Sequence, residues 1–101
     1  QVNRVMALAD GRPVYWVNVF VARTGVSAAM RLADMRNSAV VNEQIARQQS
    51  THPNLKIVEW FSALASGHNE SNIDAWLTDG LHTTTAGTAA WCDLIQAAIG
   101  V

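Results

Sequence analysis

The sequence has little cysteine, no excess of charge of either sign and no long apolar run. Its one cysteine, Cys92, excludes an internal disulfide and a cysteine-rich zinc site. Seven Lys and Arg residues stand against eight Asp and Glu residues, so the net charge of -1 provides no electrostatic footprint for nucleic acid or an anionic membrane. The longest apolar run, residues 14–22, is interrupted by Asn18 and is about half the ~20 residues that a membrane helix needs. We expect no nucleic-acid partner and no membrane contact by this segment.

The composition is that of one globular domain. Apolar residues make up 50% of the chain and charged residues 15%, which indicates a packed core, and 101 residues leave no room for a second domain. Residues 1–10 lack the basic, apolar and small-residue order of a signal peptide, and residue 1 is Gln rather than Met. We therefore expect a processed product or a piece of a longer protein.

The first part of the sequence predicts a helix, a turn and a strand. Apolar residues at helical spacing indicate a short helix over residues 2–9, which the turn sequence of residues 10–13 ends. Residues 14–21 are a β-branched and aromatic run without alternation, typical of a strand buried on both faces in a parallel sheet. Residues 26–36 have weak periodicity and stay unassigned.

The middle of the sequence predicts a helix and a second strand. Asn37 or Ser38 is expected to cap this helix, which ends before the loop at residues 50–54. Residues 55–60 indicate a strand, and the long crossover allows a right-handed parallel connection from the first strand to this one. The pattern therefore predicts a βαβ unit.

The last part of the sequence predicts a loop and a helix, completing an α-β-α-β-loop-α order. Residues 62–72 are rich in Ser, Gly, Asn and Ala and indicate the loop. Thr84 or Thr85 is expected to cap the last helix, whose apolar residues include Trp91 on the face turned inward. Cys92 is expected to be a small buried side chain.

Two parallel strands alone make an incomplete sheet. Both of its edges are open and one face of an all-apolar strand is poorly covered, whereas parallel sheets normally have more strands and helices on both sides. We expect the missing strands to come from an upstream part of the same polypeptide, from a second chain, or from a second copy of this chain.

The most informative pattern for chemistry is Asp79 followed three residues later by His82. Gly80 lets the chain turn between them, so the carboxylate reaches the imidazole N–H, fixes its tautomer and stabilises the imidazolium. His82 then acts as a general base. The alternative from spacing alone is a simple Asp-Gly turn ahead of a helix.

A family resemblance rests on three stretches of the sequence. Residues 76–87, which read WLTDGLHTTTAG, closely resemble the last block of SGNH (GDSL-like) hydrolases, in which Asp-x-x-His supplies two members of the catalytic triad. Residues 12–19 (RPVYWVNV) resemble the penultimate strand of that family, and residues 53–60 (PNLKIVEW) resemble its last strand. The Trp before the Asp and the Thr-x-x-Gly after the His are most similar to SGNH domains attached to bacterial cell-envelope acyltransferases.

The resemblance implies a fold and an activity. Residues 1–101 look like the C-terminal part of a flavodoxin-like three-layer αβα sandwich with a parallel sheet, a single partial domain that lacks the N-terminal strands and the Gly-Asp-Ser block of the nucleophile. It implies a serine esterase or O-acyl (acetyl) transfer domain in which Asp79 and His82 are catalytic, without a cofactor. The substrate is expected to be a small ester or an acylated glycan of the envelope, and an extracytoplasmic location follows from the resemblance alone.

Other polar and aromatic residues are given structural roles. The serines at positions 27, 38, 50, 62, 66 and 71 are expected to be cap or loop residues, so this chain contains no nucleophile. His52, His68 and His82 match no zinc spacing, so no metal is expected. Trp16 and Trp60 are expected in the core as strand residues, whereas Trp76 either packs or contacts substrate as the wall of an acyl or sugar pocket.

A second function, from a different class, is a non-catalytic interaction module. Here the αβ unit binds a partner, or a second copy of itself, through its open strand edge. An upstream Gly-Asp-Ser block in the gene favours the enzyme.

Overall fold

The chain folds as a mixed α/β unit with a small parallel sheet. The structure, a computed structural model, describes residues 1–65 and 70–100, with the side chains of residues 70–72 excepted. Its elements in chain order are α1 (Val2–Ala9), β1 (Val14–Val17), α2 (Ala28–Arg47), the 3-10 turn η1 (Gln48–Ser50), β2 (Leu55–Val58), α3 (Trp60–Ala65), α4 (Glu70–Trp76) and α5 (Thr85–Ile99).

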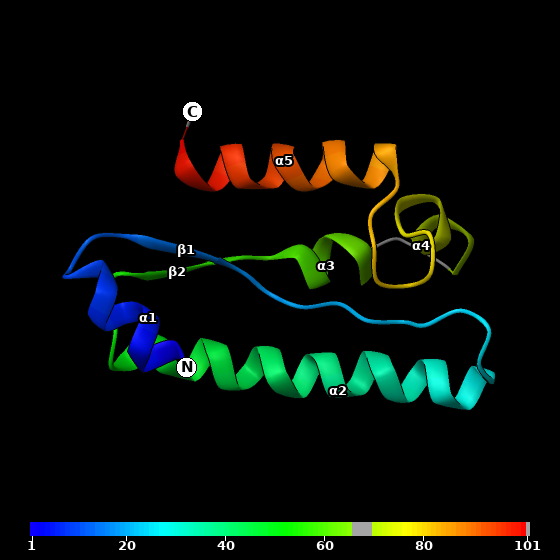
Figure 1. The fold of residues 1–101 in the computed structure, drawn as a ribbon, viewed down its shortest axis with the longest axis horizontal. Coiled ribbons are helices and arrows are strands. Elements are labelled where there is room, and N and C mark those ends of the chain that lie inside the picture. Colours follow the sequence, from blue (N-terminus) through cyan, green and yellow to red (C-terminus); the bar gives the residue numbers. More distant parts are fainter. Residues whose placement is uncertain (66–69, 101) are drawn as a thin grey trace.

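The two strands form the predicted βαβ unit. β1 pairs with β2 in parallel, from Val14 opposite Leu55 to Val17 opposite Val58, and α2 makes the crossover between them. Figure 1 shows α5 along one side of the strand pair and α1 and α2 along the other. No helix of the described residues has the length and apolar character needed to cross a bilayer.

The first strand is shorter than residues 14–21, the range predicted. Asn18 donates its N–H to the Val58 carbonyl at 3.1 Å, and this is where pairing ends, because α3 begins at Trp60 and β2 has no further residues to offer. The expectation of a strand buried on both faces was also wrong, since Tyr15 is 38% and Val19 is 40% exposed. Residues 18–23 continue as a segment outside any strand.

Helix α2 supplies the hydrogen-bond partners that a neighbouring strand would give this segment. Its side chains Asp34, Ser38 and Asn42, four residues apart, form what we call the side-chain ladder. In this ladder Asn42 Oδ1 accepts the Val19 N–H at 2.8 Å, and Ser38 Oγ accepts the Val21 N–H at 3.0 Å. Asp34 Oδ2 accepts the Arg23 N–H at 3.1 Å. Four residues of helix and two of extended chain both advance roughly 6 to 7 Å, so the spacings match.

The start of α2 lies ten or eleven residues before the predicted one, at which Asn37 or Ser38 is the cap. Ser27 caps the helix by accepting the Met30 N–H at 3.2 Å, so the unassigned residues 26–36 are largely helical. Ser38 is buried in the middle of the helix, where its hydroxyl also donates to the Asp34 carbonyl at 2.9 Å.

The predicted loop at residues 62–72 is instead largely helical in its described part. Trp60 begins α3 rather than ending β2, because Asn18 Oδ1 accepts the Phe61 N–H at 2.9 Å and so satisfies a free donor of the helix start. Asn18 Nδ2 also donates to Glu59 Oε2 at 3.0 Å, which explains how a buried amide is tolerated at the carboxyl end of the strand pair. Residues 66–69 lie outside the described residues.

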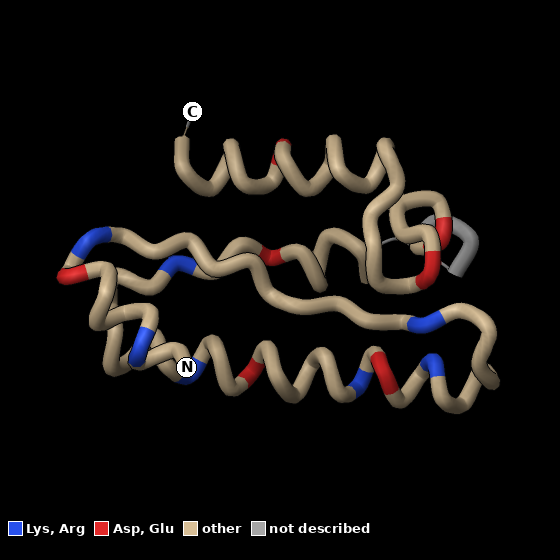
Figure 2. The backbone as a smooth tube through the Cα atoms, viewed as in Figure 1, with Lys and Arg blue, Asp and Glu red and all other residues tan. Residues whose placement is uncertain are grey.

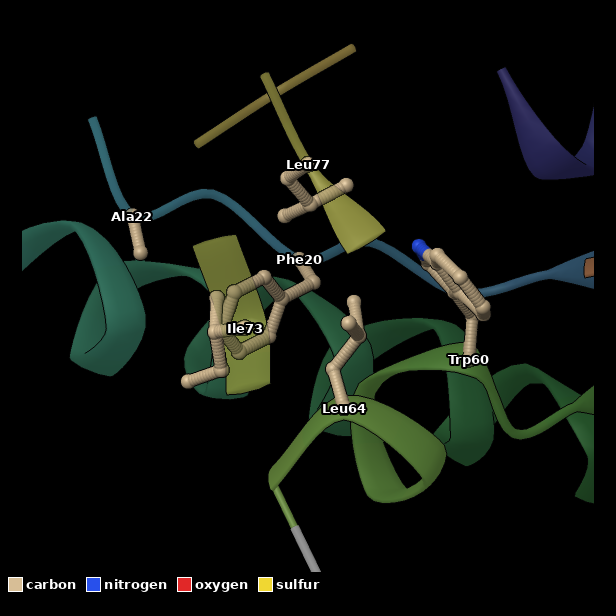
Figure 3. Close-up of a cluster of buried hydrophobic side chains, with 6 residues drawn as sticks. All are labelled: Phe20, Ala22, Trp60, Leu64, Ile73 and Leu77. Carbon is tan, nitrogen blue, oxygen red and sulfur yellow. The ribbon is translucent and has the colours of Figure 1, made fainter. Parts of the chain in front are cut away.

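A cluster of buried core side chains lies beyond the carboxyl ends of the strands. Its buried members come from the segment after β1, from α3 and from the α4 region: Phe20, Ala22, Trp60, Leu64, Ile73 and Leu77. Figure 3 shows these side chains gathered between the three segments. Trp60 is therefore a core residue as predicted, although on a helix, whereas Trp16 is only partly buried.

Helix α5 leaves much of its surface exposed. It begins where predicted, since Thr84 Oγ1 accepts the Gly87 N–H at 3.0 Å. Two expectations were wrong, because Trp91 is 36% exposed and Cys92 is also exposed. Asp93 is the one charged residue of α5, and Figure 2 accordingly shows red but no blue on this helix.

Candidate active site

The candidate site is the loop that joins α4 to α5. Leu77 and Thr83 form an isolated antiparallel bridge across its base, and Thr78 N–H donates to the His82 carbonyl at 2.8 Å. Thr84 N–H closes the loop on the Trp76 carbonyl at 2.9 Å. Residues 78–82 are therefore held as a compact turn.

Asp79 and His82 are in direct contact within this turn. Asp79 Oδ1 accepts the backbone N–H groups of Leu81 (3.0 Å) and His82 (2.8 Å), while Asp79 Oδ2 lies 2.7 Å from His82 Nδ1. The backbone N–H of His82, and next its ring, lower the pKa of Asp79 to about 2. The carboxylate is thus ionised at neutral pH and directed at the imidazole.

This geometry suits an imidazole that accepts protons at its other nitrogen. A carboxylate at Nδ1 favours the tautomer with the proton on Nδ1, so Nε2 carries the free lone pair and the carboxylate stabilises the imidazolium that forms. The side chains of His82 and Asp79 are 74% and 51% exposed, so Nε2 is accessible. The pair can act as a general base and then as a general acid.

Gly80 places the turn directly against the chain that follows β1. Its φ is +81°, and a Cβ at this position would lie 1.7 Å from the Ala22 carbonyl oxygen. Two hydrogen bonds join the segments here, from Ala22 N–H to the Gly80 carbonyl (2.9 Å) and from Thr24 N–H to the Asp79 carbonyl (3.1 Å). The catalytic candidates therefore rest on the continuation of β1, at the carboxyl end of the sheet.

Trp76 supports the loop from the α4 side. Its ring is stacked on that of Trp60, with centroids 5.9 Å apart and planes 9° apart. A Cβ at Gly87 would lie 2.0 Å from the Trp76 carbonyl, so α5 begins in close contact with this residue. Trp76 thus has the packing contacts of one of its two expected roles, and its contact with substrate stays a prediction.

None of the serines with described side chains is bonded to the pair. Ser27 and Ser50 are a helix cap and a turn residue, as predicted, whereas Ser38 and Ser62 lie within helices and bond to α2 and Glu59. Ser66 lies outside the described residues, and Ser71 lies in α4 without a described side chain. Among the described hydroxyls nearest in sequence to His82, Thr83 pairs with Thr88 at 2.7 Å.

The histidines do not gather into a metal site in the described residues. His52 Nε2 lies 2.7 Å from Asn3 Oδ1 in a separate contact between α1 and the loop before β2. His68 lies outside the described residues. No group of three or more potential ligands is present in the described part of the chain.

The sequence did not indicate two charged residues that border the site. Arg31 of α2 and Asp74 of α4 form an ion pair, and Arg31 Nε donates to the Ala22 carbonyl at 3.1 Å. Arg31 falls in the range left unassigned for weak periodicity, and Asp74 is separated from it by 43 positions. A single sequence contains no signal for such a long-range pair.

Comparisons of this chain with models of protein families, with curated proteins and with solved structures found no match.

Proposed function

We propose that this chain contributes the Asp and His of a Ser-His-Asp triad to a serine esterase or O-acyl transfer domain of the SGNH type. The observation that carries the proposal is the 2.7 Å contact between Asp79 Oδ2 and His82 Nδ1, with the His82 side chain 74% exposed. The parallel βαβ unit, with helices along both sides in Figure 1, fits the C-terminal part of a three-layer αβα sandwich. The pair also lies at the carboxyl end of the sheet, where α/β folds place their sites.

The chemistry needs a serine from outside this chain. Its Oγ attacks the acyl carbonyl of the ester while His82 Nε2 takes the hydroxyl proton, and Asp79 stabilises the imidazolium. His82 then gives that proton to the departing alcohol, leaving an acyl-serine. Water or an acceptor hydroxyl attacks this second ester, His82 again takes the proton, and serine is restored as the acid or the new ester leaves.

The open edge of β1 supports a partner that supplies this serine. Val14 donates to the carbonyl of Asn54, just before β2, and Asn18 donates to that of Val58. By alternation Tyr15 and Val17 point their backbone groups away from β2, and they have no partner in the described residues. Past the end of β1, a groove of about 310 Å³ lies between α2 and the segment after β1, lined in part by Val19, Val21 and Val41. The proposed occupant is the upstream half of the same domain, whose strand extends the sheet.

The test measures hydrolysis of a small acetyl ester by the full-length protein. Asp79→Asn and His82→Ala are each expected to lower kcat by about 10⁴-fold, as loss of a triad member does. His52→Ala is the matched control, since His52 pairs with Asn3 away from the site. Hydrolysis that survives both site substitutions would rule out the proposal.

Fluorophosphonate labelling then locates the serine. A labelled peptide upstream in the same polypeptide supports the proposed arrangement, and a label on another polypeptide assigns the nucleophile to a second chain. If no species is labelled and no ester is hydrolysed, the non-catalytic interaction module replaces the enzyme.

A further inference from the structure

Arg31 is a charged side chain whose bonds join three segments: its own helix α2, the chain after β1, and α4. It is only 12% exposed, and its guanidinium reaches from α2 to the Ala22 carbonyl and to the carboxylate of Asp74 on α4. Nε donates to Ala22 at 3.1 Å, Nη1 lies 3.4 Å from Asp74 Oδ2, and Nη2 pairs with Asp74 Oδ1. The forked shape of a guanidinium allows both partners to be held at once.

Ala22 and Asp74, the partners of Arg31 given above, border the loop that carries Asp79. Ala22, which is fully buried, offers its carbonyl to Arg31 and its N–H to the Gly80 carbonyl at 2.9 Å. The same Ala22 carbonyl is the atom nearest to Gly80, at 1.7 Å from where a Cβ would be. On the other side, Asp74 lies near the end of α4, the helix from which the loop departs.

The contacts of the Asp79–His82 pair itself are local and independent of Arg31. They lie between residues two or three positions apart in the turn. Arg31 instead fixes the peptide on which the turn rests and the helix that leads into it. Its removal is therefore expected to leave the pair assembled and to shift the turn relative to the sheet.

We propose that Arg31 is a positioning residue, which sets where His82 Nε2 meets the nucleophile and the ester carbonyl. This inference rests on the proposed function. A displacement of about 1 Å in such a geometry lowers turnover by up to roughly 100-fold. Asp74 serves the same role through Arg31.

The other arginines of the region provide controls. Arg47 lies on the same helix and pairs with Glu43 four residues earlier, with its side chain 73% exposed. Arg23 pairs with Asp34 beside the loop, but its side chain is 50% exposed and Asp34 lies on α2. These ion pairs of Arg47 and Arg23 do not involve α4.

The experiment measures ester hydrolysis by the full-length protein with Arg31→Gln, Arg31→Lys, Asp74→Asn and the double variant Arg31→Gln/Asp74→Asn. Turnover is divided by the number of sites that fluorophosphonate has labelled once labelling is complete. Folded sites that turn over slowly are counted in this way, whereas unfolded ones are not. We expect kcat per labelled site to fall about 10- to 100-fold in Arg31→Gln, with KM within about twofold. Arg31→Lys is expected to fall less, since an ammonium retains the charge but not the fork.

Two further readouts separate positioning from other roles. The acid limb of the kcat/KM pH profile is expected at the same pH in wild type and Arg31→Gln, because the Asp79–His82 contacts remain. Asp74→Asn is expected to add little once Arg31 is Gln, since both act through one contact. Arg47→Gln and Arg23→Gln are expected to match wild type.

Three results would overturn the inference. Turnover per labelled site equal to that of Arg47→Gln would leave Arg31 a purely structural residue. A shifted acid limb would mean that Arg31 acts on protonation rather than on position. If Arg31→Gln does not fold, unchanged turnover in Arg31→Lys and Asp74→Asn refutes it equally. If Asp79→Asn and His82→Ala abolish hydrolysis but Arg31→Gln leaves turnover per labelled site unchanged, the proposed function stands and only the positioning role of Arg31 fails.

Discussion

Replacing Gly80 with Ala is expected to detach the candidate site from the sheet. At φ +81° an L-residue costs about 1–2 kcal/mol, and the new Cβ would lie 1.7 Å from the Ala22 carbonyl oxygen, which is backbone and cannot turn aside. The segments must separate, so the Ala22 and Thr24 hydrogen bonds are lost, and the buried Ala22 N–H is left without a partner at about 1–3 kcal/mol. Together these two costs are expected to lower the free energy of unfolding by about 2–5 kcal/mol.

Gly25→Ala is the matched control for this substitution. Gly25 also has a positive φ, +75°, but a Cβ there would meet nothing within 4 Å. Gly25→Ala is therefore expected to lower the free energy of unfolding only by the cost of a positive φ in an L-residue, about 1–2 kcal/mol. Urea unfolding followed by tryptophan fluorescence measures both variants. Equal losses would show that the close approach of Gly80 to Ala22 contributes nothing, and the reasoning would be refuted.

Three further changes test separate parts of the fold and site by urea unfolding. Ser38→Ala leaves the Val21 N–H without its 3.0 Å partner and is expected to cost about 1–3 kcal/mol; no loss would mean that α2 does not hold that segment. Thr84→Ala removes the cap on the Gly87 N–H and is expected to cost about 1 kcal/mol, whereas an unchanged midpoint would contradict the cap. Because the pKa of Asp79 is lowered to about 2, its ionised form stabilises the fold above the ordinary Asp pKa, and this contribution is lost as the pH falls toward 2. The stability difference between wild type and Asp79→Asn is therefore expected to shrink as the pH falls from 5 to 2, and a difference that is unchanged over this range would contradict the assignment.

The elements predicted well from the sequence are those with strong local signals. The turn after α1 contains Asp10 and Gly11, both with positive φ, and the helix ends there as predicted. The parallel pairing of the two strands follows from two β-branched runs separated by a long crossover. The Asp79–His82 contact was also predictable, because three residues and one glycine fix it locally. Its role in catalysis stays a prediction.

The start of α2 was missed because this helix is held by polar contacts. Asp34, Ser38 and Asn42 face the chain with hydrogen-bonding groups, so the helix has little hydrophobic periodicity to find. Leu32 is 47% exposed, which weakens the pattern further. The length of β1 could not be predicted from its own residues either, because it is set by where β2 ends and α3 begins.

The side-chain ladder of α2 also bears on aggregation. Residues 18–23 are extended chain rich in Val and Phe, and such a segment with an open edge is a template for the strands of other molecules. Because Asn42, Ser38 and Asp34 already occupy alternate N–H groups of the segment, another strand must first displace α2 to pair there. On this side of the sheet the helix thus confines any pairing between molecules to the short edge of β1, and unfolding of α2 alone would be enough to expose an aggregation-prone strand.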